Sequence, residues 1–89
     1  MTNRLWQLNA TGLTRAYQRG TLTPSAVMDA VLAQVAKYDP LFNAFCHLDS
    51  ARAKKAAAAS TKRWQQGTQK GVLDGVPVSI KDWYDVKGW

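Results

Sequence analysis

The amino-acid sequence predicts an α/β arrangement in which helices come first and a strand comes last. Helical spacing of apolar residues recurs through residues 9–39, and an alanine-rich helical segment follows at 50–66. Residues 76–81 then alternate apolar and polar side chains, which is typical of a strand. The chain has 89 residues, which is enough for one small domain.

A short helix is expected over residues 9–19. Leu13 and Tyr17 are four residues apart, so they lie on the same face of a helix. Gly20 is the expected stop, because glycine tolerates the left-handed conformation in which many helices end.

A second helix is expected from Pro24 to about Asp39. Thr23 can cap it through its hydroxyl, and Pro24 fits the first helical position because an N–H would have no partner there. Pro40 disfavours helix in the residue before it, so the helix should end at Asp39. One face of this helix is apolar and carries Val27, Val31 and Val35.

A third helix, capped by Asp49 or Ser50, should run to about Gln66 and stop at Gly67. Before it, residues 42–48 alternate loosely, so a strand or an extended segment is expected there. The helix has a basic face with Arg52, Lys55, Lys62 and Arg63, and an opposite face with Ala53, Ala57 and Trp64. We expect the basic face to lie in solvent while the helix packs through its alanines.

The last expected element is the strand that begins at residue 76. Its apolar residues are Val76, Val78 and Ile80, and they alternate with the polar residues Ser79 and Lys81. Pro77 cannot donate to a sheet, so it should lie at the start of the strand or on an edge. A lone strand leaves backbone groups unpaired, so its partners are expected in further chain. We therefore expect a helical part, 1–67, a loop and strand, 68–89, and an incomplete single domain over 1–89.

The most specific stretch of the chain reads Leu73-Asp74-Gly75-Val76-Pro77-Val78-Ser79-Ile80-Lys81-Asp82 and continues to Asp85-Val86-Lys87-Gly88. It resembles the amidase-signature family, in which a Gly-Val-Pro segment leads into Ile-Lys-Asp. Two upstream stretches also fit that family, Leu22-Thr23-Pro24 and Asp39-Pro40-Leu41-Phe42-Asn43-Ala44-Phe45. The resemblance covers nearly the whole chain and implies that the predicted strand is the first of a mixed sheet.

The resemblance implies an enzyme that hydrolyses carboxylic amide C–N bonds through a Ser–cis-Ser–Lys triad, with no metal and no cofactor. Lys81 matches the lysine, which acts through the cis-serine as general base for the nucleophilic serine. The family's two serines lie in a Gly- and Ser-rich stretch downstream, and none of the serines here matches them: Ser25, Ser50, Ser60 and Ser79. We expect the isolated chain to be inactive and to need the remainder of the amidase domain to act on a small-molecule amide.

The chemistry of Lys81 agrees with this role. To act as a base near pH 7 its pKa must fall about 3 units from ~10.4, which burial can achieve only inside surrounding protein. Without that enclosure Lys81 is an ordinary solvated cation. Asp82 could orient the lysine or cap the following turn, and Gly75 and Pro77 are expected to set the geometry of the turn into the strand.

The formal net charge is +6. This charge indicates either an anionic partner such as nucleic acid or an acidic remainder of the protein, and the second reading is favoured. No aromatic residues interleave with the basic residues of the third helix, which disfavours binding of nucleic acid. A non-catalytic basic interaction or nucleic-acid-binding module is the alternative function.

Cys46 is the only cysteine, which fits a reducing compartment such as the cytoplasm. In a strand, Cys46 and the adjacent His47 point to opposite faces, so they cannot form a catalytic pair, and no metal site is expected. The sequence shows no long apolar run, so we expect neither a membrane segment nor a secretory signal.

Overall fold

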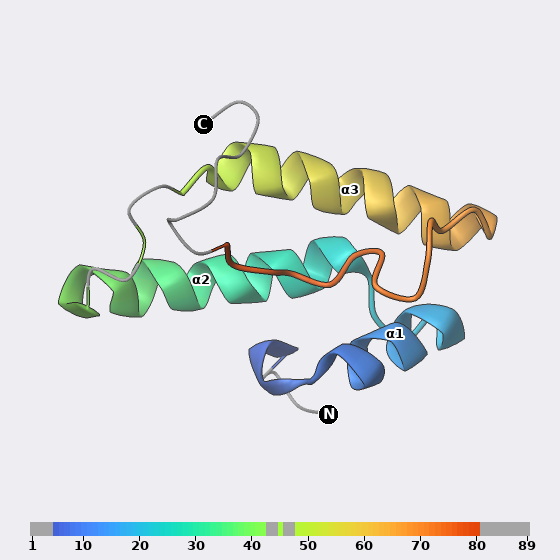
Figure 1. Ribbon diagram of the computed structural model, residues 1–89, viewed down its shortest axis with the longest axis horizontal. Helices are drawn as coiled ribbons and strands as arrows, with labels where there is room; N and C mark the ends of the chain where they lie inside the picture. The colour runs from blue at the N-terminus through green and yellow to red at the C-terminus, as the bar shows by residue number, and fades with distance from the viewer. Residues whose placement is uncertain (1–4, 43–44, 46–47, 81–89) are drawn as a thin grey trace.

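A computed structural model describes residues 5–42, 45 and 48–80 of the chain. These residues form a short 3-10 turn and three α-helices: η1 (Leu5–Gln7), α1 (Ala10–Arg19), α2 (Pro24–Phe42) and α3 (Ser50–Gln66). Figure 1 shows α2 in the middle of the molecule, with α3 along one side and α1 on the other. Residues 68–80, which we call the returning segment, leave the end of α3, turn back and run along α2.

Helix α1 begins and ends at the residues that its sequence indicates. The side chain of Asn9 caps it by accepting a hydrogen bond from the amide of Gly12 at 2.8 Å. Gly20 ends it with a φ of 74°, in the left-handed conformation expected of a glycine there. Leu13 and Tyr17 are each 4% exposed, which confirms that they form the buried face.

Helix α2 begins as expected but ends later than expected. The hydroxyl of Thr23 accepts a hydrogen bond from the amide of Ala26 at 3.2 Å, and Pro24 occupies the first helical position. The prediction of an end at Asp39 is wrong, since the helix continues through Pro40 to Phe42. Pro40 lies in the last turn near exposed residues, so a carbonyl oxygen left without its helical partner can bind water instead.

Helix α3 has the predicted bounds. Asp49 caps it through a 3.0 Å hydrogen bond from the amide of Arg52, and Gly67 ends it with a φ of 70°. Ala57 and Ser60 are its buried residues, so the small side chains allow α2 to approach closely.

The core of the described residues is small and lies where the three helices meet. Its buried members are Leu13, Tyr17 and Val27, the last with no exposed surface. Around them pack the partly buried side chains of Leu5, Leu22, Val31, Trp64 and Val76. None of the helices in the described ranges is long and apolar enough to cross a membrane.

The prediction of an α/β fold is wrong for the residues that the structure describes, which are helical and contain no strand. Residues 76–80 carry the alternation of a strand, but they form no regular structure. A strand exists only through hydrogen bonds to a neighbouring strand, and the described chain offers none. Val76 packs on the core while Val78 is 80% exposed, so the apolar residues of this segment do not all lie on one buried face.

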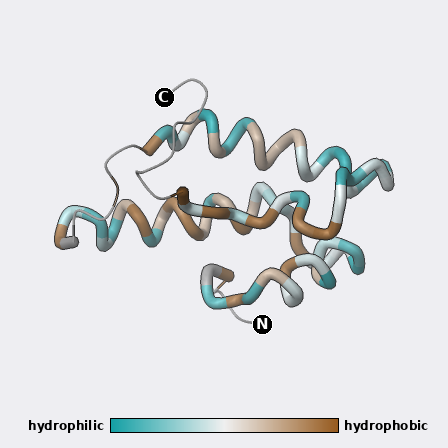
Figure 2. Tube along the Cα trace, in the orientation of Figure 1, coloured by the Kyte–Doolittle hydropathy of each residue, from teal (hydrophilic) through white to brown (hydrophobic). Residues whose placement is uncertain are grey.

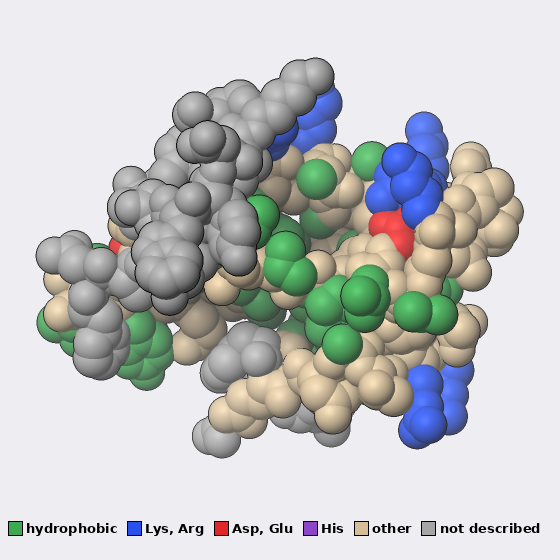
Figure 3. Space-filling view, viewed as in Figure 1, with side chains coloured by type: hydrophobic (Ala, Val, Ile, Leu, Met, Phe, Trp, Pro, Cys, Tyr) green, Lys and Arg blue, Asp and Glu red, His purple; other side chains and the backbone are tan. Residues whose placement is uncertain are grey.

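The returning segment carries apolar side chains where it runs along α2. Figure 2 shows the hydrophobic colouring of this segment, and Figure 3 shows hydrophobic side chains gathered along its outer face. The expected strand at 42–48 is not found in its described part either: Phe42 ends α2, and Phe45 and Leu48 have no regular structure. The other four residues of 42–48 lie outside the described residues.

Candidate functional site

Lys81, the predicted catalytic base, lies outside the described residues, as do Asp82, Cys46 and His47. The structure does describe the chain that leads to Lys81, up to residue 80. That chain is anchored mainly over residues 71–76, which we call the 71–76 turn. The candidate site is therefore the turn that introduces the predicted catalytic lysine.

Two backbone hydrogen bonds close the 71–76 turn. The amide of Asp74 donates to the carbonyl of Gly71 at 3.3 Å, and the amide of Val76 donates to the carbonyl of Leu73 at 3.1 Å. Each bond joins residues three apart, as in a β-turn, so the chain reverses within a few residues.

Helix α1 holds the turn through two side chains. The hydroxyl of Thr14 donates to the carbonyl of Val72 at 2.5 Å, and the phenol of Tyr17 donates to the carbonyl of Gly75 at 2.8 Å. Burial disfavours the charged phenolate and raises the pKa of Tyr17 to about 12. Tyr17 is therefore a neutral hydrogen-bond donor at physiological pH.

Helix α3 holds the turn through Trp64. Its indole Nε1 donates to the carbonyl of Asp74 at 2.9 Å. The Trp64 ring also packs against the ring of Tyr17, with centroids 5.7 Å apart and planes tilted by 48°. This aromatic contact joins the two helices whose side chains bind the turn.

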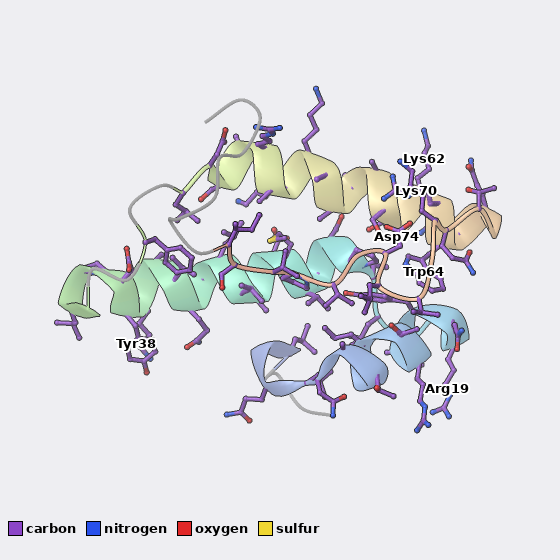
Figure 4. The ribbon with its side chains drawn as sticks, in the orientation of Figure 1. Arg19, Tyr38, Lys62, Trp64, Lys70 and Asp74 are labelled. Carbon is purple, nitrogen blue, oxygen red and sulfur yellow. The ribbon has the colours of Figure 1, made fainter. Side chains whose placement is uncertain are left out.

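The carboxylate of Asp74 makes the strongest contacts of the turn. Oδ1 accepts from the hydroxyl of Ser60 at 2.7 Å and from Nη2 of Arg63 at 2.6 Å. Oδ2 accepts from Nε of Arg63 at 2.7 Å and from the amide of Lys70 at 2.9 Å. We call these four residues the Asp74 cluster; Figure 4 shows Asp74 and Lys70 beside the end of α3.

The Asp74 side chain is 4% exposed, and that of Arg63 is 29% exposed. The hydrogen bond from Arg63 lowers the pKa of Asp74 far below its usual range, and the bonds from Ser60 and the Lys70 amide act in the same direction. The bond to Asp74 in turn raises the pKa of Arg63. Asp74 and Arg63 therefore form an ionised pair joined by two hydrogen bonds, and the carboxylate accepts two further hydrogen bonds from Ser60 and the Lys70 amide.

Ser60 and Asp74 do not form a nucleophile and its base, although their side chains are bonded. Ser60 is 2% exposed, which closes it to a substrate. The carboxylate is already bound to Arg63, and a carboxylate with a lowered pKa is a weak base. Ser60 therefore has a structural role.

Gly75 allows the turn to lie directly on the helices. Its φ is 85°, a conformation that side chains with a Cβ rarely adopt. A Cβ placed there would lie 2.6 Å from Cγ of Pro24 and 2.8 Å from Oγ of Ser60. This finding agrees with the expectation that Gly75 sets the geometry of the turn, and it adds close contact with α2 and α3 as a second reason.

The structure corrects one expectation for the basic face of α3. Arg63 was expected to lie with Arg52, Lys55 and Lys62 in solvent, but its guanidinium binds Asp74. Sequence reasoning also missed the role of Ser60. The available signal was the Asp that precedes Gly75, because a turn aspartate beside a helix end commonly binds nearby donors.

A groove of about 290 Å³ lies where the ends of α1 and α3 meet the start of α2. Its lining residues are Tyr17, Gln18, Arg19, Gly20, Leu22, Thr23, Pro24, Thr61, Trp64 and Gln65. Arg19 is the one basic side chain among the lining residues, and none of them is Asp, Glu or His. The groove therefore offers no pair of acid and base for catalysis. Within the part of the chain that the structure describes, no group of His, Cys, Asp or Glu side chains could hold a metal ion.

Comparison with known proteins gives a family match. The model of the Amidase family matches residues 26–89, which is most of the chain. No solved structure gives a significant match to the chain.

Named relatives cover most of this chain. It is 38% identical over 78 residues to a glutamyl-tRNA(Gln) amidotransferase subunit of Chloroflexus aurantiacus, which is 88% of this chain and 16% of the relative. It is 42% identical over 71 residues to the 2-amino-5-chloromuconic acid deaminase of Comamonas testosteroni, which is 80% of this chain and 15% of the relative. It is 37% identical over 70 residues to a fatty acid amide hydrolase of Oryza sativa subsp. indica, which is 75% of this chain and 12% of the relative.

The chain thus spans less than a fifth of the length of these relatives. The family match includes Gly75 and Val76 of the turn and Pro77, Lys81 and Asp82 beyond it. Together, the family model and the relatives show that this chain belongs to the amidase family.

Proposed function

We propose that residues 1–89 are the amino-terminal part of a single amidase domain, which hydrolyses carboxylic amide C–N bonds with Lys81 as its general base. One observation carries the proposal: the family match runs through 26–89 and includes Lys81 and the segment before it. The anchored 71–76 turn supports it, because a catalytic lysine needs a fixed approach. The active enzyme would also need the two serines, supplied by the remainder of the domain.

The proposed mechanism follows from what the family resemblance implies. Neutral Lys81 takes a proton, through the cis-serine, from the nucleophilic serine as that serine attacks the amide carbon. The protonated Lys81 returns this proton, through the cis-serine, to the departing nitrogen as the tetrahedral intermediate collapses, so the C–N bond breaks and the amine or ammonia leaves. Water then hydrolyses the acyl-enzyme and restores the serine. No step in this scheme requires a metal or an organic cofactor.

The partners in this proposal are an amide substrate and the remainder of the amidase domain. Names of relatives include an amidotransferase, a deaminase and a fatty acid amide hydrolase, and these suggest amide chemistry without selecting one substrate. The proposal keeps the cytoplasm as its compartment, on the same ground as the sequence expectation. The alternative of a basic binding module is weakened by Arg63, whose charge is used on Asp74.

The first test measures ammonia release from a panel of simple amides by the 89-residue chain alone. We expect no release above the buffer blank, because neither family serine is present. A rate that disappears in Lys81→Ala would show that this chain supplies its own nucleophile, and the proposed division of the domain would then be wrong.

The second test joins residues 1–89 to the remainder of an amidase-family relative, in place of the segment that they match. We expect ammonia release from this restored enzyme and its near-complete loss in Lys81→Arg, because arginine does not give up its proton near neutral pH. Lys62→Arg is the matched control, since Lys62 is an exposed lysine of α3. If Lys81→Arg keeps more than about a tenth of the activity, less than ~1.4 kcal/mol of transition-state stabilisation was lost, too little for a general base.

A further inference from the structure

We propose that Asp74 is a positioning residue: its carboxylate ties the 71–76 turn to α3 and so fixes the direction in which the chain presents Lys81. This inference rests on the proposed function of Lys81. It goes beyond that function because it assigns a role to a side chain that takes no part in the reaction itself.

The position of the turn matters because it is the anchored part of the described chain that lies nearest to Lys81 in the sequence. Lys81 follows Gly75 by six positions, so it can lie at most about 20 Å from Gly75, at ~3.3 Å per residue. Misplacement of a reacting group by about 1 Å can already cost a factor of about 100 in rate.

Among the contacts of the described residues, that of Asp74 is the one anchor of the turn that depends on a side chain of the turn itself. Thr14, Tyr17 and Trp64 all bind backbone carbonyls, so their bonds remain available whatever residue stands in the turn. The carboxylate, in contrast, accepts four hydrogen bonds at 2.6 to 2.9 Å and is buried. The residue at position 74 therefore controls the side-chain part of the link between the turn and α3, while the bond from Trp64 to the backbone remains.

The two-point contact with Arg63 also fixes orientation. One guanidinium binds both carboxylate oxygens, which holds the two groups in one plane. The turn is then held from two directions, by α3 through Asp74 and by α1 through Tyr17. Gly75 lies against Pro24 of α2 between these two points, so the turn has contacts with all three helices.

The first measurement uses the 89-residue chain. Asp74→Asn keeps the size of the side chain but removes its charge, so the two-point contact with Arg63 is lost. We expect hydrogen exchange at the amides of Asp74 and Val76 to become at least about tenfold faster, because the turn opens more often. Asp29→Asn, at an exposed position of α2, is the matched control and should leave both rates unchanged.

The deciding measurement is the pH dependence of kcat in the restored enzyme. A displaced Lys81 is less enclosed and keeps its proton to higher pH. In Asp74→Asn we expect kcat to fall at least about tenfold, KM to stay within about twofold, and the rising limb of the kcat profile to move up by at least about half a pH unit. A substitution that only reduced the amount of folded enzyme would scale kcat at every pH and leave the limb in place.

Arg63→Lys provides the same test from the other side of the pair, should Asp74→Asn not fold. It keeps the positive charge but offers one point of contact instead of two, so the limb should again move up. An unmoved limb in the folded variants, together with an inactive Lys81→Arg enzyme, overturns the role of Asp74 and leaves the proposed function standing. An active Lys81→Arg enzyme overturns the proposed function and, with it, this inference.

Discussion

The phenol of Tyr17 donates a hydrogen bond to the carbonyl of Gly75, a residue 58 positions further along the chain. Tyr17 belongs to the first α-helix, and Gly75 belongs to the turn that introduces Lys81. The amino-terminal helix therefore takes part directly in holding the chain that leads to the proposed catalytic lysine. Tyr17 also packs on Trp64, so the same residue links the turn to α3.

Tyr17→Phe should destabilise the chain by about 1 kcal/mol, because it removes the hydrogen bond and leaves the Gly75 carbonyl without that donor. Urea denaturation followed by circular dichroism measures this difference. Tyr38→Phe is the control, since Tyr38 is 43% exposed and its change should be close to zero. Equal effects in both variants would contradict a specific role of the Tyr17 phenol.

Alkaline pH should weaken the fold through the same residue. The pKa of Tyr17 is about 12 in the folded chain, against the ordinary tyrosine value of 10.0 expected in the unfolded chain. Between these two values the unfolded chain loses its proton first, so its ionisation favours unfolding. The stability associated with Tyr17 is therefore present below about pH 10 and is lost as the pH rises toward 12. Tyr17→Phe should show a smaller loss than the parent chain over this window.

Gly75→Ala should be among the most destabilising single changes in the chain. Alanine is strained at a φ of 85°, and its Cβ would meet Pro24 and Ser60 at less than 3.0 Å. The conformational cost is about 1 kcal/mol, and overpacking adds about 1 to 3 kcal/mol. Thermal unfolding measures the sum.

Two other glycines separate these costs. Gly67→Ala carries the conformational cost alone, because its φ is 70° and nothing lies within 4 Å of its Cβ position. Gly71→Ala should be nearly neutral, since its Cβ position is open and its φ lies outside the left-handed region. The expected order of destabilisation is Gly75, then Gly67, then Gly71. A Gly75→Ala chain as stable as Gly67→Ala would mean that the turn does not press on the helices.

The helices could be predicted from sequence because their determinants are local. Thr23, Asp49, Gly20 and Gly67 lie next to the helices that they start or stop, and each acts through bonds within a few residues. The predicted end of α2 at Asp39 was wrong because it rested on a local rule alone. The rule for proline considers the backbone alone, whereas Pro40 lies near solvent, where a carbonyl oxygen without its helical partner can bind water.

The strand and the Asp74 cluster could not be predicted because they depend on distant partners. The alternation at 76–80 is real, but a strand needs a second strand, and the described chain provides none. Arg63 fits a basic helix face by its spacing, and only the folded turn brings Asp74 within 2.6 Å of its guanidinium. The family motif identified the correct stretch of chain without indicating how Asp74 holds it.

Acid should weaken the fold through Asp74. Its pKa is lowered in the folded chain, so the stability from this group is present above its unfolded pKa of about 3.9 and is lost as the pH falls below that value. Asp74→Asn should cost about 2 kcal/mol at pH 7, where the parent carboxylate is ionised and bonded. The cost should shrink as the pH falls below about 4. Asp29→Asn should follow the parent chain throughout, and a constant cost of Asp74→Asn at all pH values would argue against an ionised pair.

Hydrogen exchange should divide the returning segment at the end of the 71–76 turn. The amide of Val76 is bonded to the Leu73 carbonyl, whereas among the described residues no backbone hydrogen bond is found for the amides of 78–80. We expect Val76 to exchange more slowly than Val78, and both to exchange faster than Val27, which has no exposed surface and lies within α2.

A dilution series distinguishes the two ways in which that expectation could fail. Val78 is 80% exposed and Ile80 is 45% exposed, so two copies of the chain could cover these side chains by pairing. Protection at Val78 that weakens on dilution would indicate such pairing and would leave the monomer as described. Protection that persists in the dilute monomer would mean that residues 76–80 have backbone partners within the chain, and the absence of a strand from the described residues would then be wrong.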